Sequence, residues 1–457
     1  MFKAHTRKRY FLKDGKPHFF VIDTAWMSLS NLTLDEFEEY AVFRAEQGFN
    51  AVLIMNTPIY SDMSDNVRYF PFEVREDGSF NLANINSEYF DQAEAKLTIL
   101  NSLGITPLIT VVSGAYIPGS NLANYFDCSG KQFESLEDFK KFADYTIMRY
   151  KKYNPIWMIG GDAVLNGTNY VQYKYIAKRI RKESPEDLIT AHIAGGSFID
   201  KRFIDAGFID FYTYQSGHVL DNKEDLMSPA TMAKAYYNMD KKLPVINLEP
   251  MYEAHGFGNR FGRFDSFHLR RAFWYSVLSG ANAGFTYGAH GVWTFFNHNA
   301  VFNNERWSKI PMNWRSAISL PGSYDISYCS NLFEKYNMAN IIPREDLNLT
   351  VYDEIMVAAN EDLSLVVAYT PFTNEINLPL DLNEYNCKWY ILDDHKKVIR
   401  PEITMTSGEE LCNEKKRISK GQKNTNPLPD KIREEKLISI VNMYQYNCDA
   451  VLICVKK

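Results

Sequence analysis

Eight apolar runs of strand length recur along the chain up to about residue 290. A short run of this kind is typical of a strand that is buried on both faces of a sheet. A turn formed by Asp14 and Gly15 precedes the first run and predicts a small hairpin. The eight runs are the segment that ends at Asp23, and then Asn50–Asn56, Ile105–Ser113, Ile156–Asp162, Leu188–Ala194, Asp210–Gln215, Pro244–Glu249 and Ala283–Tyr287.

Segments with helical spacing separate these runs. The first has capping-box spacing from Thr33 to Glu36 and stops before Gly48, so both helix ends are marked. The others are Glu88–Leu103, Ser135–Tyr153, Tyr170–Lys182, Met227–Met239 and Phe267–Leu278, with the weakest pattern between the fifth and sixth runs. Eight strands joined by crossover helices predict a (β/α)8 TIM barrel in preference to an open doubly wound sheet.

The pattern changes after Asn340, where strand-like runs separated by turns replace the helices. We therefore expect two domains, a catalytic barrel with an N-terminal hairpin over residues 1–340 and an antiparallel β-sandwich over residues 341–457. The segment Cys412–Lys436 is rich in polar residues and is expected to be a long exposed loop. The expected strands of the sandwich are Leu363–Tyr369, Glu375–Leu378, Lys388–Leu392 and Ala450–Val455.

Composition narrows the class of protein. The 457 residues are 46% hydrophobic, and their 50 Lys and Arg against 56 Asp and Glu give a net charge of −6, which does not favour nucleic acid as a partner. No signal peptide or membrane span is visible. Six cysteines without a Cys-x-x-Cys spacing disfavour a zinc site and a disulfide framework. We expect a soluble, cytoplasmic protein, although a secreted protein trimmed of its signal would look the same, and the oligomeric state stays open.

Two carboxylates stand where a TIM barrel places its chemistry, at the carboxyl ends of strands. Asp162 ends the fourth run after Gly160 and Gly161, and Glu249 ends the seventh run before a proline. Glycosidic bond cleavage needs such a pair, because one group protonates the leaving oxygen while the other attacks the anomeric carbon or activates water. The competing interpretation is that each acid forms a structural ion pair with Arg or Lys.

Other polar and aromatic residues at the strand ends could form a sugar pocket, because a sugar offers hydroxyls for hydrogen bonds and an apolar face for stacking. Each of them alone could equally be a core residue or a buried polar group with its bonds satisfied. The predicted substrate-binding residues are Asp23, Trp26, Asn56, His192, Tyr214, Gln215, His218, Glu253, Tyr287, His290 and Trp293.

Other chemistries find less support in the sequence. It has no phosphate-binding loop, no Gly-x-Ser-x-Gly elbow and no His-Glu-x-x-His helix. Three histidines at strand ends, His192, His218 and His290, could hold a metal as in barrel amidohydrolases, but no two have the close spacing of a dedicated ligand pair. We therefore predict neither a metal nor a cofactor, and expect an oligosaccharide as the ligand.

Several motifs together resemble the apiosidase-like glycoside hydrolases, family 140 and its relatives. The resemblance runs in order from Arg9 to Phe333. The motifs are Asp23-Thr-Ala-Trp26, Arg44-Ala-Glu-Gln-Gly48-Phe-Asn50, Ile156-Trp157 through Gly160-Gly161-Asp162, Gln215-Ser-Gly-His218, Glu249-Pro250-Met-Tyr252-Glu253, Tyr287-Gly-Ala-His290-Gly-Val-Trp293 and Pro321-Gly322-Ser323.

This resemblance implies a barrel followed by a small β-sandwich and a retaining mechanism, with Asp162 as acid/base and Glu249 as nucleophile. It also implies a hydrogen bond from Tyr214 to Glu249, a sugar platform at Trp293, and pectin side-chain oligosaccharides such as apiosides as substrates. The alternative function is a non-catalytic carbohydrate-binding protein on a degenerate barrel. Retention of both Asp162 and Glu249 argues against that alternative.

Overall fold

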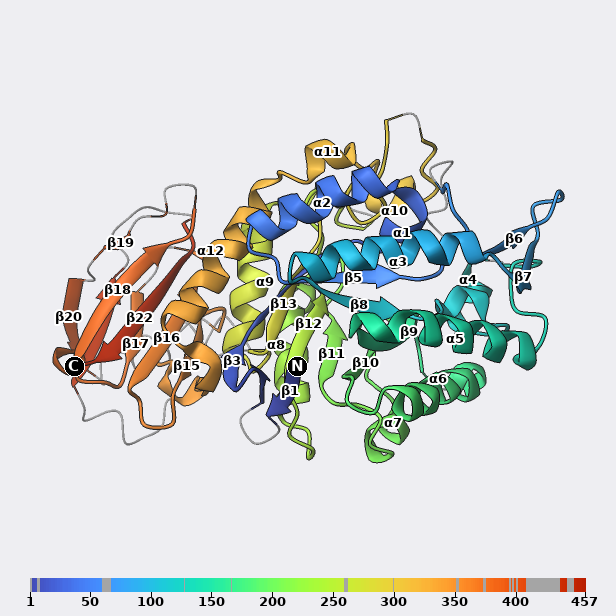
Figure 1. Ribbon diagram of the computed structural model, residues 1–457. Helices are drawn as coiled ribbons and strands as arrows, with labels where there is room; N and C mark the ends of the chain where they lie inside the picture. The colour runs from blue at the N-terminus through green and yellow to red at the C-terminus, as the bar shows by residue number, and fades with distance from the viewer. Residues whose placement is uncertain are drawn as a thin grey trace.

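The protein consists of a barrel flanked on one side by antiparallel sheets (Figure 1). Its computed structural model describes residues 2–5, 9–59, 67–126, 128–165, 167–258, 262–298, 300–350, 353–372, 375–393, 396, 398–399, 402–407, 436–441 and 448–457. Most of the polar segment Cys412–Lys436, which we expected to be a loop, therefore lies outside the described residues. No helix in the described part of the chain is long and apolar enough to cross a membrane.

The barrel is an eight-stranded parallel sheet that confirms all eight predicted strands. Its edge strands approach each other and close the barrel, because Asp210 N–H donates to Ile189 O at 2.9 Å and the hydroxyls of Thr190 and Thr213 lie 3.0 Å apart. In sequence order the strands are β4 (Phe20–Thr24), β5 (Ala51–Met55), β8 (Thr106–Thr110), β9 (Ile156–Ala163), β10 (Ile189–Ile193), β11 (Tyr212–Gln215), β12 (Val245–Glu249) and β13 (Gly284–Tyr287).

Helices cross over between these strands as predicted. The capping box of the first is present, with reciprocal bonds between Thr33 and Glu36. Between β10 and β11, where the pattern is weakest, there is only the short α7 (Lys201–Asp205). The larger helices are α2 (Leu34–Glu46), α3 (Ser87–Ser102), α5 (Leu136–Tyr150), α6 (Tyr170–Glu183), α8 (Lys223–Tyr237), α9 (Ser266–Leu278) and α12 (Pro321–Lys335).

Each barrel strand has one set of side chains inside the barrel and one set against the helices. Along β9, Ile156 and Met158 belong to the cluster inside the barrel, whereas Trp157 and Ile159 pack among the helices. Successive side chains of a strand point to opposite faces. Position within this two-residue period therefore decides whether a side chain near a strand end can reach the barrel mouth.

A small antiparallel sheet covers the amino end of the barrel. It consists of β1 (Phe2–His5), β2 (Tyr10–Lys13) and β3 (Lys16–His18), and the predicted Asp14-Gly15 hairpin joins the last two. The Phe11 ring packs edge-on against Phe20 and Phe211, with both centroids 5.0 Å away. The barrel interior is thus filled from this end. A cavity of about 440 Å³ lies outside this packing, at the amino ends of β8, β9 and β10, whereas TIM barrels place their chemistry at the carboxyl ends of the strands.

Two further elements follow the barrel strands β5 and β8, one a hairpin and the other a short helical segment. The long connection between β5 and α3 contains a hairpin of β6 (Phe72–Val74) and β7 (Phe80–Ile85). After β8, the 3-10 helix η2 (Gly114–Tyr116) leads into the short α4 (Asn121–Tyr125). Neither element has the apolar periodicity that revealed the barrel strands.

The C-terminal region forms two antiparallel sheets whose facing sides share an apolar cluster, as expected of a sandwich. The outer face of the larger sheet packs on α9, where the rings of Trp274 and Tyr369 are stacked 6.4 Å apart. The larger sheet holds β14 (Ile342–Pro343), β15 (Met356–Ala359), β16 (Leu365–Thr370), β22 (Ala450–Lys456), β18 (Tyr385–Ile391) and β19 (Val398–Ile399), and the smaller holds β17 (Glu375–Leu378), β21 (Lys436–Val441) and β20 (Glu402–Ser407).

The cysteines depart in part from the expectation of unpaired thiols. Cys387 of β18 and Cys454 of β22 face each other across the ladder and form a disulfide. The other described cysteines, Cys128, Cys329 and Cys448, are not part of this disulfide and are buried. The cytoplasmic location, which we inferred partly from the cysteine pattern, stays a prediction.

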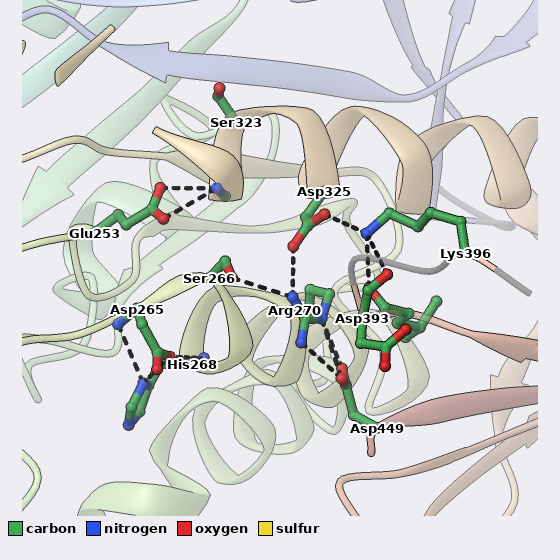
Figure 2. Close-up of polar contacts among 12 residues, drawn as sticks. Glu253, Asp265, Ser266, His268, Arg270, Ser323, Asp325, Asp393, Lys396 and Asp449 are labelled. Atoms are coloured by element: carbon green, nitrogen blue, oxygen red, sulfur yellow. Dashed lines mark hydrogen bonds and ion pairs between the residues drawn. The ribbon is translucent and has the colours of Figure 1, made fainter. Parts of the chain in front are cut away.

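A buried ion network joins the barrel helices to the C-terminal sheets (Figure 2). Arg270 of α9 is 5% exposed and donates to both carboxylate oxygens of Asp449, at 2.7 and 2.9 Å. It also pairs with Asp325 of α12, which in turn accepts from Lys396. Two carboxylates and two cations compensate one another here, as buried charges require.

We expect Arg270→Ala to destabilise the protein strongly, because it leaves Asp325 and Asp449 buried without their main partner. Loss of one member of a buried pair costs about 3–5 kcal/mol of unfolding free energy. Urea denaturation measures this change. Arg315→Ala is the matched control, because Arg315 pairs with Glu39 at the surface and such pairs contribute less than about 1 kcal/mol. Equal, small losses in both variants would contradict the importance of the buried network.

Candidate active site

A cavity of about 750 Å³ opens at the carboxyl end of the barrel. It is lined by side chains from the loops and ends of most barrel strands, whereas none of the described residues of the C-terminal sheets lines it. Both predicted catalytic carboxylates lie in it. The predicted residues that line the cavity are Asp162, Glu249, Trp26, His192, Gln215, His218 and Trp293.

A bulge at the end of β9 presents Asp162 to this cavity. The register with β10 pairs His192 with Gly160 and the next residue, Ile193, with Ala163, so Gly161 and Asp162 are extra residues on β9. A Cβ atom at Gly160 would lie 2.2 Å from His192 O, so only glycine allows this approach. Asp162 itself has a φ of 55°, a left-handed conformation that aspartate tolerates better than most residues.

A second bulge, at the end of β12, turns Glu249 into the cavity. Tyr214 of β11 pairs with Asn247, but Gln215 pairs with Glu249. Asn247 points outward to Ser276 of α9, at 3.1 Å, and strict alternation would direct Glu249 the same way. The extra residue at the bulge instead brings Glu249 to the inner face, which is a common use of bulges beside active sites.

His192 connects the two carboxylate-bearing strands. The backbone N–H of Asp162 donates to His192 Nδ1 at 2.8 Å, so this nitrogen carries a lone pair. Nε2 must then carry the proton of the neutral ring, and it donates to Glu249 Oε2 at 2.7 Å. One imidazole therefore fixes the position of the Asp162 backbone relative to the Glu249 carboxylate.

Hydrogen bonds to both oxygens keep Glu249 ionised although it is only 7% exposed. His218 Nε2 bonds Oε1 at 3.0 Å, and His192 bonds Oε2. Burial acts to raise the pKa of Glu249, but the two histidine hydrogen bonds outweigh it and hold the pKa well below its usual range. A carboxylate that is ionised and desolvated in this way is suited to act as a nucleophile.

Asp162 has the opposite ionisation behaviour. Burial, followed by the negative charge of Glu249, raises the pKa of Asp162 to about 6. A carboxyl with this pKa retains its proton in mildly acidic solution and can donate it to a leaving group. The two carboxyl groups of the cavity thus have widely separated pKa values, the pattern that assigns an acid and a nucleophile.

An indole at the base of the cavity is held by polar contacts behind it. Trp293 Nε1 donates to His290 Nδ1 at 3.0 Å, and His290 Nε2 bonds Lys309 O at 2.8 Å. His290 does not line the cavity, so it orients Trp293 and is not placed to contact a ligand. Across the cavity base, Trp26 Nε1 donates to Tyr252 Oη at 2.9 Å.

Asp23 and Asn56 do not face the cavity, and their predicted contact with a ligand is not supported by their positions. Asp23 is fully buried and accepts from Arg44 Nε at 2.8 Å and from Tyr40 Oη at 2.7 Å. Asn56 accepts from Tyr150 Oη at 2.9 Å. Both have the register position of residues that pack against the helices, and Asp23 forms a buried ion pair with Arg44 there.

The predicted hydrogen bond from Tyr214 to Glu249 is wrong. Tyr214 has the same outward register and donates its hydroxyl to Pro229 O of α8, at 2.8 Å. Tyr252 lines the cavity together with Glu249, and burial and then the charge of Glu249 raise the pKa of its hydroxyl. A phenol that is buried against a carboxylate is the group we expected of Tyr214, supplied by the loop after β12.

Glu253 does not line the cavity either, and its carboxylate points to the first turn of α12 (Figure 2). It accepts from Tyr287 Oη at 2.6 Å and from the backbone N–H of Gly322 at 2.9 Å. Burial raises its pKa to about 7, against these hydrogen bonds. Glu253 and Tyr287 together anchor the first turn of α12 and are not placed to bind substrate hydroxyls.

Several residues of the lining that sequence reasoning did not propose come from loops and short helices that follow the barrel strands. His255 stacks on His218 with ring centroids 4.6 Å apart and supports it from behind. Trp307, Tyr125 and Phe126 line the outer part of the cavity. Tyr252 stands in the motif that begins at Glu249, and the sequence signal for His255 is that it follows this motif closely. The other three residues have no such signal.

The three histidines considered as metal ligands instead form hydrogen bonds with other side chains of the site. His192 and His218 bond opposite oxygens of Glu249, and His290 bonds Trp293. Among the described residues no group of three or more His, Cys, Asp or Glu side chains is arranged to hold a metal ion.

Comparisons with known proteins agree with this geometry. The family model of the apiosidase-like catalytic domain matches residues 5–340. A search of the curated proteins found no match. A solved structure described as a glycoside hydrolase is 18% identical with a TM-score of 0.76, and covers 100% of this chain and 97% of its own. Two structures from Bacteroides vulgatus ATCC 8482 also match over 100% of this chain, a glycoside hydrolase of family 5 (20% identity, TM-score 0.75, 93% of its own chain) and a putative glycoside hydrolase (16%, 0.64, 82%).

We expect Glu249→Gln to lower the pKa of Asp162 from about 6, because it removes the negative charge that opposes ionisation there. The pKa should stay above that of an exposed aspartate, since burial is unchanged. Carbon-13 NMR titration of labelled aspartates measures it. Glu253→Gln is the control and should leave the Asp162 titration unchanged. If Glu249→Gln also leaves it unchanged, the two carboxyl groups are not electrostatically coupled.

Proposed function

Since the chain belongs to the apiosidase-like family of glycoside hydrolases, we propose that it cleaves pectin side-chain oligosaccharides, such as apiosides, with retention of anomeric configuration. The family supports the substrate class. The mechanism is supported by the paired carboxyl groups at the ends of β9 and β12, in a cavity large enough for more than one sugar ring.

One observation carries the assignment of roles: both oxygens of Glu249 accept hydrogen bonds from histidines, whereas the Asp162 carboxyl has no such partner among the described residues. Glu249 is therefore the ionised member and Asp162 the protonated member of the pair. This division favours Glu249 as the nucleophile and Asp162 as the acid.

In the first step, Glu249 attacks the anomeric carbon and forms a glycosyl ester while the bond to the leaving oxygen breaks. Asp162 transfers its proton to that oxygen, so the leaving group departs as a neutral alcohol. His192 and His218 hold the carboxylate in place. As negative charge leaves Glu249 in the ester, the pKa of Asp162 falls, because the repulsion that raised it disappears.

In the second step, Asp162, now ionised, removes a proton from water as the water attacks the anomeric carbon. The ester bond to Glu249 breaks and the carboxylate is restored between its two histidines. Two displacements at the same carbon give net retention. Trp293 offers an apolar face to the sugar ring, and Gln215 and Trp26 supply polar and aromatic contacts beside it.

The alternative function is a carbohydrate-binding protein on a degenerate barrel. Such a protein would need the pocket, but it would not need one ionised and one protonated carboxyl group. A binding site gains nothing from a carboxyl group with a raised pKa beside an ionised one, and the desolvation of both is unfavourable. Catalysis accounts for the raised pKa of one carboxyl group and for the burial of both.

We expect Glu249→Gln to abolish turnover while it keeps substrate binding, because the amide retains the size of the side chain but lacks the attacking charge. The rate should fall by several orders of magnitude. Proton NMR of the wild-type reaction gives the rate and the anomer released first, and titration calorimetry gives the affinity. If the first product has the inverted configuration, the retaining mechanism is excluded.

The matched control is Glu253→Gln, in the same loop but outside the cavity. It should keep most of the turnover and lower thermal stability, since Glu253 anchors α12 through Gly322. Full turnover in Glu249→Gln, together with loss of turnover in Glu253→Gln, would require a different nucleophile. Carbohydrate binding without any turnover by the wild-type protein would favour the binding-protein alternative.

The pH dependence gives a separate test of Asp162. Because Asp162 must be protonated in the first step, kcat/KM should decline as the pH rises through about 6, the pKa of this group. Asp162→Asn should lose this basic limb with a glycosyl fluoride, whose leaving group needs no proton. Stopped assays across the pH range measure both profiles. An unchanged basic limb in Asp162→Asn would assign the acid to another residue.

A further inference from the structure

The cavity has an aromatic wall that the proposed reaction does not yet use. It is formed by Tyr125, the last residue of α4, and by Phe126, and both line the cavity. Tyr125 is 81% exposed, far more than the tyrosines of the core. Its hydroxyl has no hydrogen-bond partner in the described part of the chain. Large exposed aromatics beside a cavity are typical of ligand contacts.

The Tyr125 ring is held in a defined direction by its neighbour. The rings of Tyr125 and Phe126 lie 4.8 Å apart at 90° to each other, which is a favourable edge-to-face arrangement. Phe126 is half-buried and packs against the main core. The partly buried ring therefore positions the exposed ring, and the exposed ring has a free face.

Short-range contacts fix α4 beside Asp162. Asn121 Oδ1 accepts from the backbone N–H of Val164, at 3.2 Å, and Val164 lies two residues after Asp162. At Gly114 a Cβ atom would lie 3.0 Å from Ala163 Cβ, so η2 packs closely on the end of β9. Figure 1 shows α4 next to the carboxyl ends of β8 and β9, far from the C-terminal sheets.

The chemistry at Asp162 determines which part of a substrate lies on this side. Glu249 and the general acid act on opposite faces of the anomeric centre, because the acid protonates the oxygen that departs. The sugar that forms the ester lies over Glu249 and Trp293. The leaving group therefore extends toward Asp162, and thus toward α4.

We infer that Tyr125 forms a stacking platform for the sugar ring of the leaving group, with Phe126 as its positioning residue. This inference rests on the proposed glycosidase function and extends it to the substrate class: the preferred leaving group is a ring with an apolar face, such as a second sugar residue. A sugar ring presents its axial C–H groups to an aromatic face, and this contact stabilises the bound substrate by dispersion and by exclusion of water.

The test compares two substrates that share the same glycone, a pectin side-chain oligosaccharide and the corresponding glycosyl fluoride. Fluoride cannot reach or stack on Tyr125. Tyr125→Ala should therefore lower kcat/KM on the oligosaccharide by about 3- to 10-fold, mainly through KM, and change kcat/KM on the fluoride less than about 2-fold. Tyr125→Phe should retain the wild-type values, because it keeps the ring.

Tyr324→Ala is the matched control, since Tyr324 is a tyrosine of α12 that is 49% exposed and lies outside the cavity. It should leave both substrates unaffected. An equal loss on both substrates in Tyr125→Ala would overturn the inference in favour of a structural role for α4. No loss on either would overturn it as well, while leaving the glycosidase function intact.

If the wild-type protein turns over neither substrate, the proposed function is refuted. Measurements of binding affinity still test the inference in that case. Titration calorimetry with the same oligosaccharide and with its terminal monosaccharide would then be compared in wild type and Tyr125→Ala. A selective loss of oligosaccharide affinity supports the platform independently of catalysis. Equal affinities in the two proteins would overturn it.

Discussion

The site depends on one buried imidazole. His192 accepts a hydrogen bond from the Asp162 backbone at one ring nitrogen and donates to the Glu249 carboxylate from the other. This ring lies on β10 and joins the ends of β9 and β12, which are not neighbours in the barrel. Because the backbone bond fixes the tautomer, the ring can present only a donor to Glu249. The position of both carboxyl groups and the ionisation of one of them follow from this arrangement.

Burial by itself does not decide how the two carboxyl groups ionise. Both are desolvated, and desolvation raises the pKa of each. The difference comes from their partners, because Glu249 accepts two histidine hydrogen bonds and then repels a second negative charge at Asp162. The same pair of side chains without His192 and His218 would have no clear assignment of acid and nucleophile.

Residues that do not line the cavity hold its parts in place from several directions. His290 orients Trp293, Glu253 anchors α12 through Gly322, and Arg44 neutralises Asp23 behind β4. The C-terminal sheets act at a greater distance, through Arg270 and the ring stack on α9. Their contribution is to the stability of the barrel helices, because none of their residues lines the cavity.

The barrel, the C-terminal sandwich and the two carboxylates could be predicted from the residue pattern alone, because buried parallel strands are continuous apolar runs and a polar residue that ends one stands out. The alternation of side chains along each strand carried further information, which the choice of substrate-binding residues did not use. Asp23, Asn56, Tyr214 and Tyr287 share the register of residues that pack on the helices, and the structure places all four there.

The other features of the site depend on contacts that form only in the folded protein. The bulges on β9 and β12 interrupt the alternation of side chains at the strand ends that carry Asp162 and Glu249. Strict alternation would have directed Glu249 toward α9. Tyr252 and His255 come from the loop after β12 and Tyr125 from the short α4, and the position of such segments depends on contacts with other parts of the chain and not on local pattern. The pairing of His192 with both carboxylate-bearing strands joins residues far apart in sequence, and such a contact exists only after the barrel has closed.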